Sequence, residues 1–289
     1  MKVILSRKGF DSTYGGYPSF ILPNGKMVSL PIPSSKDTFS YDDLQFDEKI
    51  TYMNYMKKIS AKIRDKKQIV LDQNAMCHLD PDLNRTVLCN RAADWKGCFG
   101  QTGSAQAVLE KHCVGEGDLF LFFGWFNILL EEDGHVAFSK GEGFHAIYGY
   151  LQIDRKYYTA TNTSLPEWVN YHPHMIERRK IRPNNCIYIA KDYVSWNETI
   201  PGYGCFSFDE QLRLSKNGMS RSKWALPDIF RGLDITYHSA DSWKEDYFQS
   251  AHRGQEFVIE ENDAITHWAI DCNQCGNFRC IAARRYNGS

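Results

Sequence analysis

Residues 117–126 read GDLFLFFGWF, and residues 144–153 read FHAIYGYLQI. Both are apolar runs rich in aromatic side chains, which is typical of strands that are buried on both faces. The Gly117-Asp118 pair predicts a tight turn before the first run. Gly149 indicates a point where the second strand bends or admits a close neighbour. We therefore expect these two strands to form the centre of the fold.

The segments around these strands differ in type and do not alternate regularly. Residues 18–33 predict a β-hairpin because two apolar runs flank Asn24-Gly25, and residues 131–143 predict a hairpin tip. We expect helices over 48–66, 100–112 and 239–251, and shorter strands over 185–190 and 204–208. Irregular alternation favours an α+β fold over a doubly wound α/β fold. The sequence predicts a single α+β domain over residues 1–289, with residues 269–289 as a cysteine-containing C-terminal tail.

The charge and composition are those of an ordinary globular chain. The 34 basic and 35 acidic residues give a net charge of −1, so no global field draws the protein to DNA or to an anionic membrane. Residues 1–5 predict a strand rather than a signal peptide, and the longest apolar run is too short to cross a bilayer. Nine cysteines, an odd number, are typical of reduced thiols. We expect a cytoplasmic protein without a membrane partner.

The N-terminal strand runs into Ser6-Arg7-Lys8-Gly9-Phe10-Asp11-Ser12. Two adjacent cations beside a flexible glycine suit a phosphate or another anion. Asp11 would add a carboxylate that takes part in catalysis. The alternative interpretation is a surface ion pair at the end of a strand, which is usually weak.

His78-Leu79-Asp80-Pro81-Asp82 is the most promising polar cluster for chemistry. Pro81 disfavours helix at Asp80, and in an extended segment His78, Asp80 and Asp82 project to the same side. One imidazole and two carboxylates at this spacing would bind a divalent metal or act as an acid and base pair. The alternative is an Asx turn followed by a helix N-cap.

Several further residues are candidates for substrate binding. Gln101 and Gln106 flank a predicted helix start, where backbone N–H groups hold phosphate and amide side chains read a base edge, or where they simply cap the helix. Arg253 and Glu256 precede a strand, and Glu256 would act as a base or orient Arg253. His145 lies within the second central strand. His172 and His174 flank a proline and would be either ligands or structural residues.

The C-terminal cysteines raise the question of a zinc site. Cys272, Cys275 and Cys280 cluster in the sequence, and His267 would have to supply the fourth ligand of a structural zinc. A cluster of reduced thiols is the other interpretation, and the sequence favours it because three cysteines do not make two ligand pairs.

The two central strands resemble those of PUA-like barrels, including EVE, YTH and ASCH domains, over about forty residues. In such domains a Gly-Asp-apolar-Phe strand precedes an apolar-Gly-apolar strand. The resemblance implies an antiparallel barrel or sheet with flanking helices, and binding of a modified base among aromatic side chains. Trp125, Phe126 and Tyr148 would form that cage, or else pack in the core.

A wider resemblance covers roughly residues 1–260. Its motifs are Ser6 to Ser12, His78 to Leu83, Phe99-Gly100-Gln101 with Ala105-Gln106, Gly117 to Gly124, His172-Pro173-His174, Pro201-Gly202, Trp224 with Leu226-Pro227, and Arg253 to Val258. In combination they resemble the third of the nucleotide-modification-associated domain families. That resemblance implies a setting of nucleotide or DNA base modification and does not supply a reaction.

Two hypotheses follow. In the first, the chain is an enzyme that acts on a nucleotide or nucleic-acid base. Arg7 and Lys8 hold a phosphate, and Trp125 stacks on the base. Acid–base or metal chemistry falls to Asp11, His78, Asp80 and Asp82, and the substrate is oriented by Gln101, Gln106, His145, Arg253 and Glu256. In the second, the chain is a non-enzymatic reader of a modified base in DNA or RNA. A divalent metal is possible as a cofactor, and the oligomeric state stays open. Enzymes converge titratable groups in one pocket, whereas a reader needs an aromatic cage.

Overall fold

The computed structural model describes residues 1–47, 50–59, 64–65, 68–69, 75–133, 135–161 and 164–286, with side chains at 1–46, 50–59, 75–133, 135–161 and 164–276. The strands are β1 (Val3–Arg7), β2 (Tyr14–Gly15), β3 (Ser19–Ile21), β4 (Met27–Val28), β5 (Phe39–Ser40), β6 (Gln45–Asp47), β7 (Ile50–Thr51), β8 (Arg64–Asp65), β9 (Gln68–Ile69), β10 (Met76–Cys77), β11 (Cys98–Gln101), β12 (Leu119–Glu132), β13 (His135–Phe138), β14 (Phe144–Tyr158), β15 (Cys186–Ala190), β16 (Tyr193–Val194), β17 (Asn197–Pro201), β18 (Tyr203–Cys205), β19 (Lys223–Trp224), β20 (Phe248–Gln249) and β21 (Glu256–Ile259). The helices are α1 (Tyr52–Lys58), α2 (Gly103–Lys111), α3 (Glu177–Lys180) and α4 (Asp263–Tyr286). These elements make a mixed α+β fold, as the sequence predicts.

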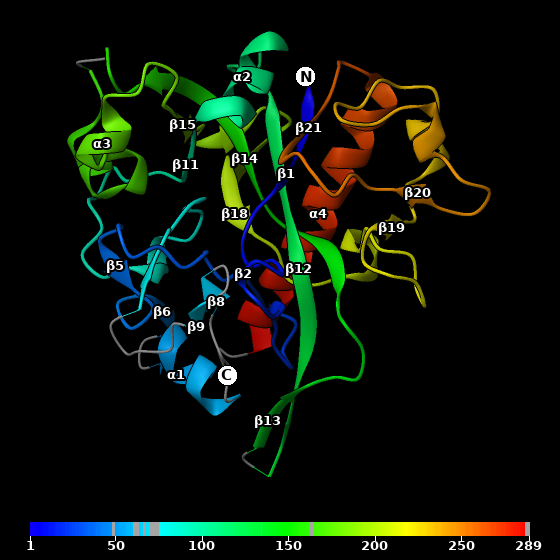
Figure 1. Cartoon of the computed structure of the whole chain (residues 1–289), viewed down its shortest axis with the longest axis horizontal. Helices are drawn as coiled ribbons and strands as arrows, with labels where there is room; N and C mark the ends of the chain where they lie inside the picture. The colour runs from blue at the N-terminus through cyan, green and yellow to red at the C-terminus, as the bar shows by residue number, and fades with distance from the viewer. Residues whose placement is uncertain are drawn as a thin grey trace.

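The two predicted central strands form the centre of the main sheet. Within the described residues, ten strands belong to this sheet, with β11-β15-β14-β12-β1-β21 as its main path. The antiparallel pair β12 and β14 runs along the length of the molecule, and β13 continues it at one end (Figure 1). Asp118 confirms the predicted turn, since its carboxylate accepts the backbone N–H groups of Gly115 and Lys2 at 3.0 and 2.8 Å.

One side of β12 changes partner along its length, and this opens the sheet. Its first half pairs in parallel with β1 up to Arg7 and Phe123, and its next stretch pairs with β3 from Phe126 onward. Between them Gly124 lies so close to the backbone that an added Cβ would stand 2.7 Å from the Lys8 carbonyl oxygen. Residues 9–18 therefore leave the main sheet at this point, and β2 within them pairs with β8 in a separate small sheet.

Both faces of the central strands are buried, which explains the nearly continuous apolar sequence. Leu119, Leu121 and Phe123 of β12 pack on one face with Ile265 and Ala269 of α4. Phe120 and Phe122 pack on the other face with Leu109 of α2. A third apolar cluster gathers α1 and the β3–β4 hairpin. These three cores hold the loops that surround the gap beside β12.

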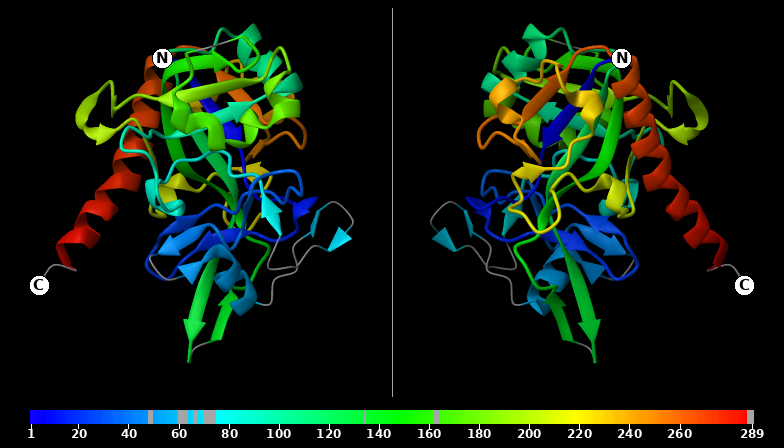
Figure 2. Two further views of the ribbon diagram at one scale, coloured as in Figure 1. Left: turned by 90° about the vertical axis from the view of Figure 1, so that its left-hand side faces the viewer. Right: turned by 90° about the vertical axis from the view of Figure 1, so that its right-hand side faces the viewer.

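The C-terminal segment is a helix rather than a tail. In α4, the Asn262 side chain accepts the Ile265 N–H at 3.1 Å and so caps the N-terminus. The helix runs along the body of the molecule and its far end projects away (Figure 2). The helix predicted over 239–251 is wrong. A single 3-10 turn forms at Ala240–Ser242, and the chain then extends into β20, because Phe248 of β20 pairs with Trp224 of β19.

Other predicted elements form with changed boundaries. The Asn24-Gly25 hairpin is confirmed by the pairing of β3 with β4. The helix predicted over 48–66 is confirmed only over Tyr52–Lys58 as α1, which starts at a capping box between Thr51 and Asn54. Within the predicted range, Ile50–Thr51 and Arg64–Asp65 are the strands β7 and β8, and residues 48–49, 60–63 and 66 lie outside the described residues. The helix predicted from Gly100 starts at Gly103, because 98–101 pair with β15. In the described part of the chain no helix is long and apolar enough to cross a membrane.

Candidate functional site

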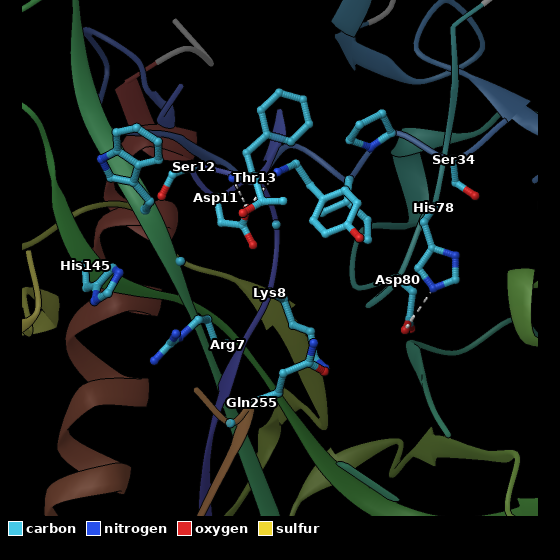
Figure 3. Close-up of a pocket in the computed structure, with 18 of the residues that line it drawn as sticks. Arg7, Lys8, Asp11, Ser12, Thr13, Ser34, His78, Asp80, His145 and Gln255 are labelled. Atoms are coloured by element: carbon cyan, nitrogen blue, oxygen red, sulfur yellow. Dashed lines mark hydrogen bonds and ion pairs between the residues drawn. The ribbon is translucent and has the colours of Figure 1, made fainter. Parts of the chain in front are cut away.

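A cavity of about 1010 Å³ lies where β1 and β12 separate. Its walls come from residues far apart in the sequence: 7–14, 32–36, 78, 80, 100–102, 124–125, 142, 145, 174, 179, 220–222, 251–252 and 254–255. Figure 3 shows Arg7 and His145 on one side of this space and His78 with Asp80 on the other, with Lys8 and Gln255 between them. The loop 9–14, which leaves the sheet at Gly124, forms one wall.

Asp80 is the centre of a buried polar cluster in this cavity. Its side chain is 4% exposed, and three imidazoles surround it. Its Oδ1 accepts the Gly100 N–H at 2.8 Å and lies 3.3 Å from His172 Nε2. Its Oδ2 lies 3.8 Å from His78 Nε2 and 3.7 Å from His174 Nε2. Burial favours the neutral acid, but His172 and the other imidazoles outweigh it and hold the pKa of Asp80 well below its usual range.

His78 is oriented from behind by an ion pair. Its Nδ1 lies 2.9 Å from Asp37 Oδ2, and the buried Asp37 carboxylate is also paired with Arg179. Burial of Asp37 is outweighed by its hydrogen bonds to His78 and Arg179, which lower its pKa well below the usual range. Asp37 is thus a permanent acceptor, and the Nδ1 of His78 carries a proton.

His174 is held by an amide whose orientation is fixed. Asn185 donates its NH₂ group to Thr159 Oγ1 at 2.7 Å and to the His174 carbonyl oxygen at 2.8 Å. Its Oδ1 is therefore the atom 2.6 Å from His174 Nδ1, and that ring nitrogen is the donor. Burial lowers the pKa of His174 to about 3, although Asp80 opposes the shift. His174 is neutral at pH 7, and its Nε2 carries a lone pair.

His172 supports Asp80 from the side away from the cavity. Its Nδ1 accepts the His174 backbone N–H at 3.2 Å, so the proton of the neutral ring is on Nε2. That Nε2 faces Asp80 Oδ1 but is buried without a hydrogen bond of good geometry.

Two arginines lie at the opposite end of the cavity. Arg7 donates to the backbone carbonyls of Ala251 and His252 at 2.5 and 3.1 Å, and Arg221 donates to Ser12 Oγ at 2.6 Å. Neither forms an ion pair within the described residues. Burial is the main cause that lowers the pKa of both arginines; Asp11 opposes the shift in each, Glu142 also opposes it in Arg221, and Arg221 adds to the lowering in Arg7. Two cations without a direct ion pair in one cavity attract an anion.

Lys8 is neutralised where Arg7 is not. Its ammonium lies 2.8 Å from Glu256 Oε1 and 4.4 Å from the centre of the Phe99 ring. Gln101 donates to the same carboxylate oxygen at 2.6 Å, and Glu256 is fully buried. Lys8 and Gln101 reach the cavity wall, whereas Glu256 orients Lys8 from beneath rather than Arg253.

His145 and Trp125 lie beside the two arginines. Trp224 donates its indole N–H to His145 Nδ1 at 3.1 Å, and burial lowers the pKa of His145 well below its ordinary value. The Arg221 guanidinium stacks 4.0 Å from the centre of the Trp125 ring, whose N–H donates to the Glu142 carbonyl. Trp125 thereby holds Arg221 against the cavity wall.

The predicted aromatic cage does not form around this space. Phe126 and Tyr148 contact each other with ring centres 5.5 Å apart and are buried in the core, Phe126 fully. Besides the histidines, the aromatic residues that line the cavity are Phe10, Tyr14 and Trp125. Charged and histidine side chains thus outnumber the other aromatic residues in the walls.

Other predicted site residues lie elsewhere. Asp82 does not line the first cavity: it pairs with Arg91 at 2.6 Å, accepts the Tyr171 hydroxyl at 2.7 Å and borders a second cavity of about 980 Å³, which Asp80 also lines. Gln106 is buried against Tyr188. Arg253 is exposed and does not line the cavity. Asp11 does line it, and its Oδ1 closes a turn by accepting the N–H groups of Thr13 and Tyr14.

The C-terminal cysteines do not gather with His267 in the described residues. His267 is exposed and donates within its own helix or to solvent, whereas Cys272 is buried against the core and Cys275 contacts Gln211. The side chain of Cys280 lies outside the described residues. The described group of His, Cys, Asp and Glu side chains with metal-ligand spacing is His78, Asp80 and His174.

A comparison with protein families places the chain in one of them. The chain matches the profile of nucleotide modification associated domain 3 over residues 2–260. It belongs to that family. No curated protein and no solved structure matches the chain. Arg7, His78, Asp80, His174 and Arg221 all lie within the matched range of the family, and α4 lies beyond it. The PUA-like resemblance stays a prediction.

Sequence reasoning missed several residues of this nucleotide-modification domain. The sequence left His172 and His174 as either ligands or structural residues. Their spacing around a proline was the signal that could have identified them as residues of the site. Asp37, Arg179, Asn185 and Arg221 gave no local signal, because each becomes a partner of the site through contacts with distant segments.

Proposed function

We propose that this domain is an enzyme that modifies a nucleotide or a nucleic-acid base. The observation that carries the proposal is the convergence of four titratable side chains, Asp80, His78, His174 and His145, with two unpaired arginines in one cavity. Enzymes concentrate such groups, whereas a base reader surrounds its ligand with aromatic rings.

The two ends of the cavity suit the two parts of a nucleotide. Arg7 and Arg221 offer charge and N–H donors to a phosphate, and Ser12 beside Arg221 adds a hydroxyl. The Asp80 cluster at the opposite end supplies imidazoles and a carboxylate for the chemical step. A volume of about 1010 Å³ is large enough for a nucleotide. Membership of a nucleotide-modification family supports this substrate class.

The first experiment is a thermal-shift screen of the whole chain with deoxynucleotides, ribonucleotides and oligonucleotides with plain or modified bases. A ligand at about 100 times its Kd raises the free energy of unfolding by about 2.7 kcal/mol. Mass spectrometry of the incubated ligands then detects a modified product. Binding of modified oligonucleotides alone, without any product, would support the reader and contradict the proposal.

Replacing Arg7 or Arg221 by Gln should weaken nucleotide binding about 10- to 100-fold, since a hydrogen bond to a charged group contributes about 1.5–3 kcal/mol. Titration calorimetry measures the change in Kd. Arg178→Gln is the matched control, because Arg178 is exposed and does not line the cavity. An equal loss of nucleotide affinity in all three variants would show a non-specific charge effect, and it would contradict a role of Arg7 and Arg221 in binding the nucleotide.

A further inference from the structure

In the Asp80 cluster, His78 Nε2, His174 Nε2 and Asp80 Oδ2 face one another. His174 carries its proton on Nδ1, where Asn185 Oδ1 accepts it, so the Nε2 that points to Asp80 Oδ2 at 3.7 Å is a lone pair. Lone pairs on nitrogen and carboxylate oxygen repel each other when buried. Such an arrangement is stable when a cation lies between them.

His78 adds a second nitrogen to the same point. Its Nδ1–H donates a hydrogen bond to Asp37, whose carboxylate is held as an acceptor by its ion pair with Arg179. With Nδ1 engaged by Asp37, Nε2 is the ring nitrogen left for a metal, and it faces Asp80 Oδ2 at 3.8 Å. A carboxylate that accepts from the outer nitrogen is the usual partner of a metal-bound histidine, because it fixes the tautomer and raises the basicity of the ligand.

Asp80 offers the third donor atom. Its Oδ1 is engaged by the Gly100 N–H and faces the proton on His172 Nε2, so Oδ2 is left for the two other imidazoles. His172 Nε2 is buried and has no hydrogen bond of good geometry. A cation on the Oδ2 side would hold the Asp80 carboxylate between His172 on one side and the imidazoles of His78 and His174 on the other.

We propose that His78 Nε2, His174 Nε2 and Asp80 Oδ2 bind one divalent first-row transition-metal ion at the wall of the cavity. The three donor atoms lie within 4.8 Å of one another. Metal bonds of about 2.1 Å place tetrahedral ligands about 3.4 Å apart. The separations of Asp80 Oδ2 from His174 Nε2 and His78 Nε2, 3.7 and 3.8 Å, are slightly longer than this, so the site contracts when the ion binds.

The donor set selects the class of metal. Two imidazoles and one carboxylate suit Fe²⁺, Mn²⁺, Co²⁺ or Zn²⁺, whereas Mg²⁺ and Ca²⁺ prefer oxygen ligands alone. Three protein ligands leave coordination positions open, which distinguishes a catalytic site from a closed structural one. All three residues line the cavity, so the open positions face the space for the substrate. That last step rests on the proposed function, while metal binding does not.

The test is a titration of the whole protein with Co²⁺ after removal of metals by a chelator. Visible absorption reports the coordination of Co²⁺, and elemental analysis gives the stoichiometry. We expect one ion per chain, and we expect His174→Ala and His78→Ala each to weaken binding at least 100-fold. His112→Ala is the matched control, because His112 lies on the surface beside Glu260, and it should bind Co²⁺ as the natural sequence does.

A positioning role for Asp37 gives a separate readout. Asp37→Asn should weaken Co²⁺ binding about 10- to 100-fold, the usual effect of removing an outer partner, while the absorption spectrum at saturation stays unchanged. Circular dichroism verifies that each variant is folded, and His78→Ala and His174→Ala give independent tests if one of them is not.

The metal inference and the proposed function can fail separately. Absence of Co²⁺ binding, or equal binding by the natural sequence, His78→Ala and His174→Ala, would overturn the metal site whatever the protein does to nucleotides. A bound ion without any nucleotide binding would leave the metal site standing and contradict the proposed function instead.

Discussion

Asp82→Ala should lower the free energy of unfolding by about 3–5 kcal/mol, because it leaves a buried arginine without its counter-ion. The side chains of Asp82 and Arg91 are 0% and 5% exposed, and Arg91 Nη2 lies 2.6 Å from the carboxylate. The guanidinium lies against the rings of Trp95 and Tyr171, at 4.4 and 4.7 Å from their centres, which limits its solvation once the carboxylate is removed. Urea denaturation followed by circular dichroism measures the effect.

Two controls separate this explanation from a general effect of removing a carboxylate. Asp154→Ala removes an exposed acid whose contact with Arg155 is 3.8 Å long, and it should change the free energy of unfolding by less than about 1 kcal/mol. Adding Arg91→Met to Asp82→Ala should recover part of the loss, because the unpaired charge is gone. If Asp82→Ala is as stable as the natural sequence yet inactive, Asp82 belongs to the catalytic machinery after all.

Gly100→Ala should abolish metal binding through a single methyl group. On β11 an added Cβ would stand 2.4 Å from the His174 ring and 2.8 Å from His172 Cε1. Both imidazoles pack on this glycine, so the methyl group must push His174 away from Asp80. Overpacking costs about 1–3 kcal/mol of stability, and we expect the Co²⁺ affinity to fall at least 100-fold. Co²⁺ titration and thermal unfolding measure the two effects.

Gly115→Ala is the matched control for this change. The nearest atom to its added Cβ is the Cys113 carbonyl oxygen at 3.9 Å, which is an ordinary contact. It should bind Co²⁺ with unchanged affinity. Unchanged Co²⁺ affinity in Gly100→Ala would show that His174 is not a ligand, because the structure gives its ring no space beside a methyl group.

The central strands could be predicted because their local pattern and their burial agree. Residues 119–126 and 144–153 are apolar on both faces, and both faces are covered. The helix over 263–286 was not predicted, because its buried residues Ile265, Ala269 and Cys272 stand among polar ones and its packing surface is supplied by the sheet. Helices of this kind gain their stability from tertiary contacts rather than from propensity.

The sequence by itself determined the α+β class, the two central strands, the turn at Asp118 and the candidates Arg7, His78 and Asp80. These features depend on hydrophobic period, turn chemistry and short motifs, which are local. Only the tertiary structure decided that Asp80 meets His174 rather than Asp82, and that Arg221 joins Arg7. The residues of the site that lie between positions 37 and 221 come together at the cavity because separate cores hold their loops around one gap in the sheet. No local pattern of residues encodes such an arrangement.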